Sequence, residues 1–103
     1  MLIHKNNTTT TAVRLNKHYQ DLYNLTKQHN LNFKSSLECF ICSNIDSDFV
    51  YNNKDSNKDN QKIVGISLGK EFIELLKEKE KPLTDAVKSF LDYFEASLGS
   101  SLH

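Results

Sequence analysis

The sequence of 103 residues is poor in the residues that build common motifs: it has no Trp, one Pro, three Gly and two Cys. Its glycines, Gly65, Gly69 and Gly99, form neither a phosphate-binding P-loop nor a dinucleotide fingerprint. No run approaches the ~20 apolar residues that a membrane-spanning helix needs. The first ten residues, MLIHKNNTTT, lack the apolar core of a secretory signal. We therefore expect an intracellular protein, cytoplasmic or nuclear, with no membrane partner and with reduced thiols.

The residues that are present fit one small domain. Apolar residues make up 38% of the chain, and six Phe and four Tyr supply bulk for a core. The stretch 52–62 contains no hydrophobic residue, which is typical of an exposed loop. We expect a flexible tail at 1–11, a single α+β domain at 12–99 with a mobile polar loop at 52–62, and a C-terminal tail at 100–103.

Hydrophobic spacing predicts the order of helices and strands. Steps of three and four between apolar residues indicate helices, and alternating or continuous apolar runs indicate strands. The predicted elements are, in chain order, a helix at 13–29, strands at 31–45, 48–51 and 63–68, a helix at 69–81 that breaks before Pro82, and a helix at 83–98. The predicted fold class is α+β: a small antiparallel sheet of three strands packed on helices in the order α-β-β-β-α-α. The threonines at 8–11 offer a fourth strand.

The stretch 31–45 carries two conflicting patterns. Every second residue is apolar or small, which is typical of a strand with one buried face. The same stretch contains Cys39-Phe40-Ile41-Cys42, the spacing of half a zinc site or of a redox pair. On a strand the cysteines would point to opposite faces with their Cα atoms ~10 Å apart, too far for one metal. We therefore predict a strand with Cys39 in the core, and no metal ion or cofactor.

Acid–base catalysis has no strong candidate in this sequence. His18 and His29 share one helical stripe but are ~16 Å apart along it. No Ser, Cys or Asp stands at a recognised motif spacing from either histidine, and packing at the helix edge is the simpler interpretation of both. Asp46 and Asp48 flank a predicted turn, and Asp55 and Asp59 lie in the polar loop at 52–62, which lacks the spacing and the terminal Glu of a calcium loop. We predict no catalytic residue and no enzyme activity.

Charge is balanced overall but unevenly distributed. Residues 1–35 contain five basic residues and one acid, and the remainder contains eight basic residues and twelve acids. The basic side chains Arg14, Lys17, Lys27 and Lys34 offer an alternative function, nucleic-acid binding. The predicted helix, three strands and helix also follow the element order of double-stranded-RNA-binding domains. The lysine cluster expected at the start of the second helix is missing, so only the order agrees.

Apolar side chains outside the predicted core suggest a protein partner. Phe40 and Cys42 fall on the polar face of the predicted strand at 31–45, and Tyr23 and Tyr93 lie off the main stripes of their helices. An aromatic residue on the outer face of a strand suits strand addition or dimerisation. The alternative is that the N-terminal tail or the first helix covers that face. We predict a non-enzymatic protein-interaction or regulatory module that forms a homodimer or joins a larger assembly.

Overall fold

The computed structural model describes residues 8–51 and 61–101, which form two strands and four helices in the order β-α-α-β-α-α. The predicted order α-β-β-β-α-α, with three or four strands, is therefore wrong, although the chain is a small single-domain α+β protein. The elements are β1 (Thr8–Leu15), α1 (Lys17–Gln28), α2 (Phe33–Asn44), β2 (Lys62–Gly69), α3 (Lys70–Glu78) and α4 (Leu83–Ser101).

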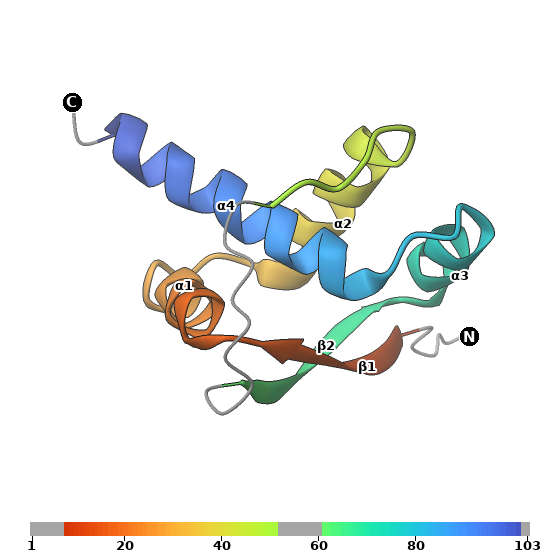
Figure 1. Cartoon of the computed structure of the whole chain (residues 1–103), viewed down its shortest axis with the longest axis horizontal. Helices are drawn as coiled ribbons and strands as arrows, with labels where there is room; N and C mark the ends of the chain where they lie inside the picture. Colours follow the sequence, from red (N-terminus) through yellow and green to blue (C-terminus); the bar gives the residue numbers. More distant parts are fainter. Residues whose placement is uncertain (1–7, 52–60, 102–103) are drawn as a thin grey trace, which may run out of the picture.

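β1 and β2 form one antiparallel sheet, in which Val13 lies opposite Val64. The helices lie on one side of this sheet, as Figure 1 shows. Strand residues alternate between the two faces, and those that point toward the helices include Val13, Leu15, Ile66 and Leu68, each at most 1% exposed. The strand residues on the opposite face are exposed, so the sheet buries one face only.

The predicted helix at 13–29 is wrong at its start, because β1 continues to Leu15. Asn16 follows with an extended backbone (φ −77°, ψ 176°), and its side-chain oxygen accepts a hydrogen bond from the N–H of Tyr19 at 3.0 Å. Asn is among the most effective N-caps, so the helix begins only at Lys17. The residues Thr8–Thr11, expected in the flexible tail, form the first half of β1, where β-branched side chains are favourable. The rest of that tail, 1–7, lies outside the described residues.

The predicted strand at 31–45 is wrong, because most of it forms α2. Leu37 and Ile41 are fully buried as expected, but a spacing of four residues fits a helix face as well as a strand face. Asn32 favours the helix, because its side chain accepts a hydrogen bond from the N–H of Ser35 at 3.2 Å and caps the first turn. The described residues 48–51, expected to pair with this strand, are not a strand.

The predicted strand at 63–68 is confirmed as the centre of β2. Ile63 is 64% exposed on the open face of the sheet, so this apolar run is covered on one face only. The predicted polar loop at 52–62 is shorter at its end, because Lys62 already belongs to β2. Residues 52–60 of that loop lie outside the described residues.

α3 ends before the predicted break at Lys81. Glu80 has a left-handed backbone with φ 58°, a conformation that ends a helix. The N–H groups of Glu80 and Lys81 bond to the carbonyls of Lys77 and Leu76 at 3.0 and 2.9 Å, which closes a Schellman-type turn.

α4 begins where predicted and continues past its predicted end. It runs to Ser101 and so includes part of the predicted tail at 100–103. Residues 102–103 lie outside the described part of the chain. Neither α4 nor another helix among the described residues has the length and apolar character to cross a membrane.

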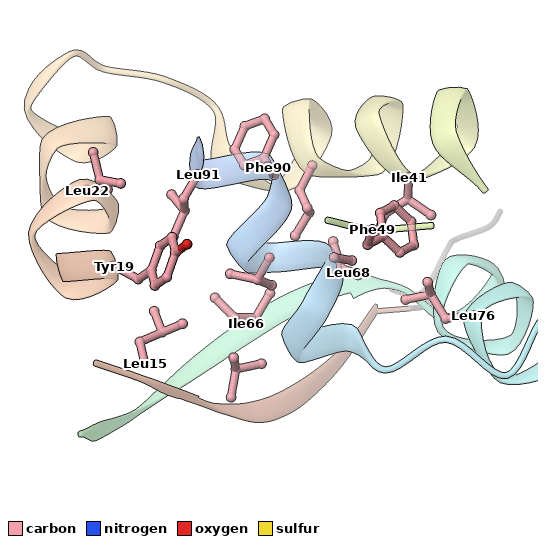
Figure 2. Close-up of a cluster of buried hydrophobic side chains, with 14 residues drawn as sticks. Leu15, Tyr19, Leu22, Ile41, Phe49, Ile66, Leu68, Leu76, Phe90 and Leu91 are labelled. Atoms are coloured by element: carbon pink, nitrogen blue, oxygen red, sulfur yellow. The ribbon is translucent and has the colours of Figure 1, made fainter. Parts of the chain in front are cut away.

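The core lies between the sheet and the helices, and Figure 2 shows its side chains converging from both. Each helix contributes to it, as does Phe49 from the segment after α2. Fully burying one such aliphatic or aromatic side chain contributes about 1.5–3 kcal/mol. The buried apolar residues are Val13, Leu15, Tyr19, Leu22, Leu37, Ile41, Phe49, Ile66, Leu68, Leu76, Ala86, Val87, Phe90 and Leu91.

Candidate protein-binding groove

A shallow, open groove of about 660 Å³ lies between α2 and α4, and we call it the α2–α4 groove. Its α2 wall is built from small side chains. Ser35, Cys39 and Ser43 follow one another at intervals of four residues, so they form one stripe along the helix. All three are exposed. This stripe lets another chain approach the backbone of α2 closely.

The α4 wall is aromatic. Phe90, Tyr93 and Phe94 line the groove from three neighbouring positions of the helix. Phe90 is 4% exposed and belongs to the core, whereas Tyr93 is 60% exposed. Phe90 is therefore held in place by the core, whereas the ring of Tyr93 is accessible to a ligand.

Phe40 links the two walls at the base of the groove. Its ring centroid lies 5.5 Å from that of Phe90 and 5.7 Å from that of Tyr93. It also lies 6.1 Å from Phe49 in the core. Aromatic pairs at these distances contribute about 0.5–1.5 kcal/mol each beyond their buried area. The base of the groove is therefore held in place by packing before any partner binds.

The chemistry of the groove is that of apolar contact. The side chains that line it are aromatic, aliphatic, hydroxyl, amide or thiol groups, and none of them is charged. The thiol of Cys39 lines the groove, and none of the side chains that line it is a carboxylate, an imidazole or an amine. The lining therefore suits an apolar ligand that is held by shape, and it offers no acid–base pair for catalysis.

Phe40 and Cys42, predicted to share one exposed face, lie on different sides of α2. Residues two apart differ by about 200° around a helix, whereas on a strand they share a face. Phe40 is half-buried in the base of the groove, and Cys42 is exposed on the side of α2 that faces α3, where it lines a hollow with Phe72 and Leu75. The shared face predicted for Phe40 and Cys42 depended on a strand at 31–45, which the structure does not contain.

The two cysteines are free and exposed. The prediction that Cys39 lies in the core is wrong, because helical geometry turns it away from Leu37 and Ile41 toward the groove. Cys39 and Cys42 are about one helical turn apart, so they do not point to opposite faces as they would on a strand.

Tyr23, the third predicted surface residue, is partly covered. Its ring packs edge-on against Phe33 with centroids 4.9 Å apart, and the ammonium group of Lys27 lies 4.5 Å from its centroid. Tyr23 therefore supports the junction of α1 and α2 and does not reach the α2–α4 groove.

The four predicted basic residues lie on three different elements. Arg14 is exposed on the outer face of the sheet, on β1. Lys17 pairs with Asp21 at 3.0 Å and Lys34 pairs with Glu38 at 3.1 Å, both within one helix. These carboxylates neutralise part of the charge that the alternative of nucleic-acid binding requires.

Sequence reasoning missed most of the groove. It singled out Phe40 and Tyr93, but not Phe94 or the stripe of small residues on α2. The available signal was the interval of four residues from Ser35 to Cys39 and Ser43, which the interpretation as a strand assigned to a buried face. Comparisons with protein families, curated proteins and solved structures give no match for this chain.

Proposed function

We propose that this protein is a small non-enzymatic interaction module that binds an apolar helical segment of a partner protein in the α2–α4 groove. The observation that supports this proposal is an uncharged groove with a wall of small residues on α2 and an aromatic wall on α4.

The shape of the groove favours a helix as the ligand. Amphipathic helices bind in apolar grooves through side chains at i, i+3, i+4 and i+7. The serine and cysteine stripe allows close approach on one side, while Tyr93 and Phe94 offer rings for the anchor side chains on the other.

A separate protein fits this groove better than a second copy of the chain. The large apolar side chains that are strongly exposed in the described residues are Val50, Ile63 and Tyr93. Val50 and Ile63 lie outside the helices. Tyr93, on α4, already lines the groove, so outside the groove the described helices have no strongly exposed large apolar side chain that would fill the groove of a neighbour.

Nucleic-acid binding remains the alternative and has weaker support. Its candidate residues lie on β1, α1 and α2, and Lys17 and Lys34 are each paired with a carboxylate. A protein that binds through phosphate contacts loses affinity steeply as salt rises. The partner proposal predicts binding that changes little with salt, because the groove lining is uncharged.

The test is selection of helical peptides on the wild-type chain from a displayed library whose apolar face is randomised. The variant Tyr93→Glu places a charge at the exposed edge of the groove without removing a core residue. Asn24→Glu adds the same charge at an exposed position of α1 and is the matched control. We expect selected peptides to lose about tenfold or more in affinity with Tyr93→Glu, an effect typical of an interface anchor, and to keep it with Asn24→Glu.

Three outcomes would overturn the proposal. One is a library that yields no binder, and another is a set of binders that Tyr93→Glu does not weaken. The third is a wild-type dimer, detected by light scattering, that Tyr93→Glu converts to a monomer, because the groove would then be filled by a second copy.

A further inference from the structure

Three metal-binding side chains converge on the side of α4 that faces α1. The ligand atoms of His18, Asp92 and Glu95 all lie within 4.8 Å of one another. Nε2 of His18 is 3.6 Å from Oε1 of Glu95. The three residues come from two helices that are far apart in the sequence, so the fold, and not local spacing, brings them together.

The start of α1 positions the histidine. Because Asn16 caps α1, His18 falls in the first turn, and its ring packs edge-on against Tyr19 with centroids 4.9 Å apart. Asp92 and Glu95 are three residues apart on α4 and therefore share one face of that helix. The imidazole from α1 thus meets two carboxylates from α4.

A buried hydroxyl fixes one of the carboxylates. The Oη of Tyr19 donates a hydrogen bond to Oδ2 of Asp92 at 3.1 Å, and Tyr19 is 0% exposed. Hydrogen bonds of this kind orient the ligands of metal sites. Asp92 is therefore positioned by the core, while the side chains of His18 and Glu95 remain 34% and 52% exposed and open to solvent.

We infer that His18, Asp92 and Glu95 form a binding site for a divalent transition metal, with zinc as the best fit. Ligand atoms that bind one tetrahedral zinc at about 2.0–2.2 Å lie about 3.4 Å apart, close to the 3.6 Å between His18 and Glu95. Three protein ligands with a water in the fourth position is a common zinc arrangement. The imidazole favours zinc over magnesium and calcium, which prefer oxygen ligands.

The metal would join α1 to α4. It would also replace the electrostatic repulsion between two neighbouring carboxylates with a shared positive charge. Because the unfolded chain does not hold the three ligands together, binding stabilises the folded state by an amount that grows with the logarithm of the metal concentration once this exceeds the dissociation constant. The site lies apart from the α2–α4 groove, so its test is independent of the proposed function.

The experiment is titration of the full chain with zinc, followed by calorimetry and by thermal unfolding. Cobalt(II) serves as a spectroscopic probe, because its spectrum distinguishes thiolate ligands from nitrogen and oxygen ligands. The variants are His18→Gln and Glu95→Gln, both at solvent-accessible positions, and His29→Gln, at the exposed residue that follows α1, is the matched control. Tyr19→Phe tests the orientation of Asp92.

We expect one zinc per chain, a higher melting temperature with zinc, and a cobalt spectrum without a thiolate band. His18→Gln and Glu95→Gln should each weaken binding by about tenfold or more, and His29→Gln should leave it unchanged. Tyr19→Phe should weaken binding by about tenfold, as changes around metal ligands do. No zinc binding by the wild type would overturn the inference. So would binding that persists in His18→Gln and is lost in Cys39→Ser with Cys42→Ser, which would assign the metal to the thiols.

Discussion

The change in the free energy of unfolding when Glu38 is replaced tests the position of α2 against the end of β2. Oε2 of Glu38 accepts a hydrogen bond from the backbone N–H of Gly69 at 2.7 Å, at the end of β2, and the Glu38 side chain is only 13% exposed. The same oxygen lies 3.1 Å from Nζ of Lys34. In the alternative of a strand at 31–45, Glu38 would face solvent, and its removal would have little effect.

The expected magnitude follows from these two contacts. A hydrogen bond to a charged group contributes about 1.5–3 kcal/mol, and its loss leaves the N–H of Gly69 without its acceptor. The ion pair with Lys34 is exposed on one side and contributes about 0.3–0.5 kcal/mol. We therefore expect Glu38→Ala to lower the free energy of unfolding by about 2 kcal/mol, which is about 8–16 °C in melting temperature for a domain of this size.

Urea and thermal unfolding followed by circular dichroism measure this difference. Lys34→Ala is the control, because it removes the ion pair and leaves the bond to Gly69, and it should cost about 0.5 kcal/mol or less. Equal, small effects of the two variants would show that Glu38 does not reach Gly69. The placement of α2 against the end of β2 would then be refuted.

Three further predictions concern single residues. Glu80→Gly should stabilise the protein by about 1 kcal/mol in urea unfolding, because a left-handed backbone at φ 58° disfavours a side chain; a destabilised variant would contradict the turn. Asn16→Ala should cost about 0.5–2 kcal/mol in the same assay, because it removes the cap of α1; no loss would argue against this helix start. Burial, and then the charge and hydrogen bond of Asp85, raise the pKa of Tyr51 above its ordinary value of 10.0. The contribution of neutral Tyr51 to the free energy of unfolding should therefore be fully present below pH ~10 and be lost as the pH rises above it, because Tyr51 ionises first in the unfolded chain. Tyr51→Phe should reduce this loss of stability at high pH, and an unchanged slope would contradict the assignment.

The C-terminal part of the fold could be predicted from the sequence because its patterns have one interpretation. The continuous apolar run at 63–68 has the length of a strand and is shorter than a typical helix. In α4, apolar residues repeat at helical intervals over several turns. The turn after α3 was expected near Pro82. Its exact place depended on the backbone of Glu80, whose residue type gives no signal for a left-handed conformation.

The N-terminal part could not be predicted because its patterns fit two structures. Leu37 and Ile41 are four residues apart, a spacing that fits the period of a helix and that of a strand. Ser35 and Ser43 continue the alternation of small or apolar residues with polar ones, so the pattern is also typical of a strand. Phe40 is the residue that breaks the alternation and fits a helix beside Leu37 and Ile41. Asn16 and Asn32 carry the other signal, because each caps a helix that begins at the next residue.

Both candidate sites depend on contacts between distant parts of the chain. Cys39 faces Tyr93 across the groove, and His18 meets Asp92 and Glu95 between α1 and α4. Hydrophobic periodicity predicts which face of a helix is buried, but not which helix packs beside it. The sequence could therefore suggest single exposed aromatic residues but not the groove or the ligand set.

The two native thiols provide the most direct measurement of the central claim, that a helix binds in the α2–α4 groove. Cys39 lines the groove, Cys42 lies outside it, and both are free and exposed in the unbound protein. Alkylation of each thiol by iodoacetamide is followed by mass spectrometry, with and without a saturating selected helical peptide. The account predicts that the peptide slows alkylation of Cys39 by about tenfold or more, because anchors at the centre of an interface are shielded from water, while Cys42 reacts at its original rate. Equal protection of both thiols, or protection of neither, would contradict it.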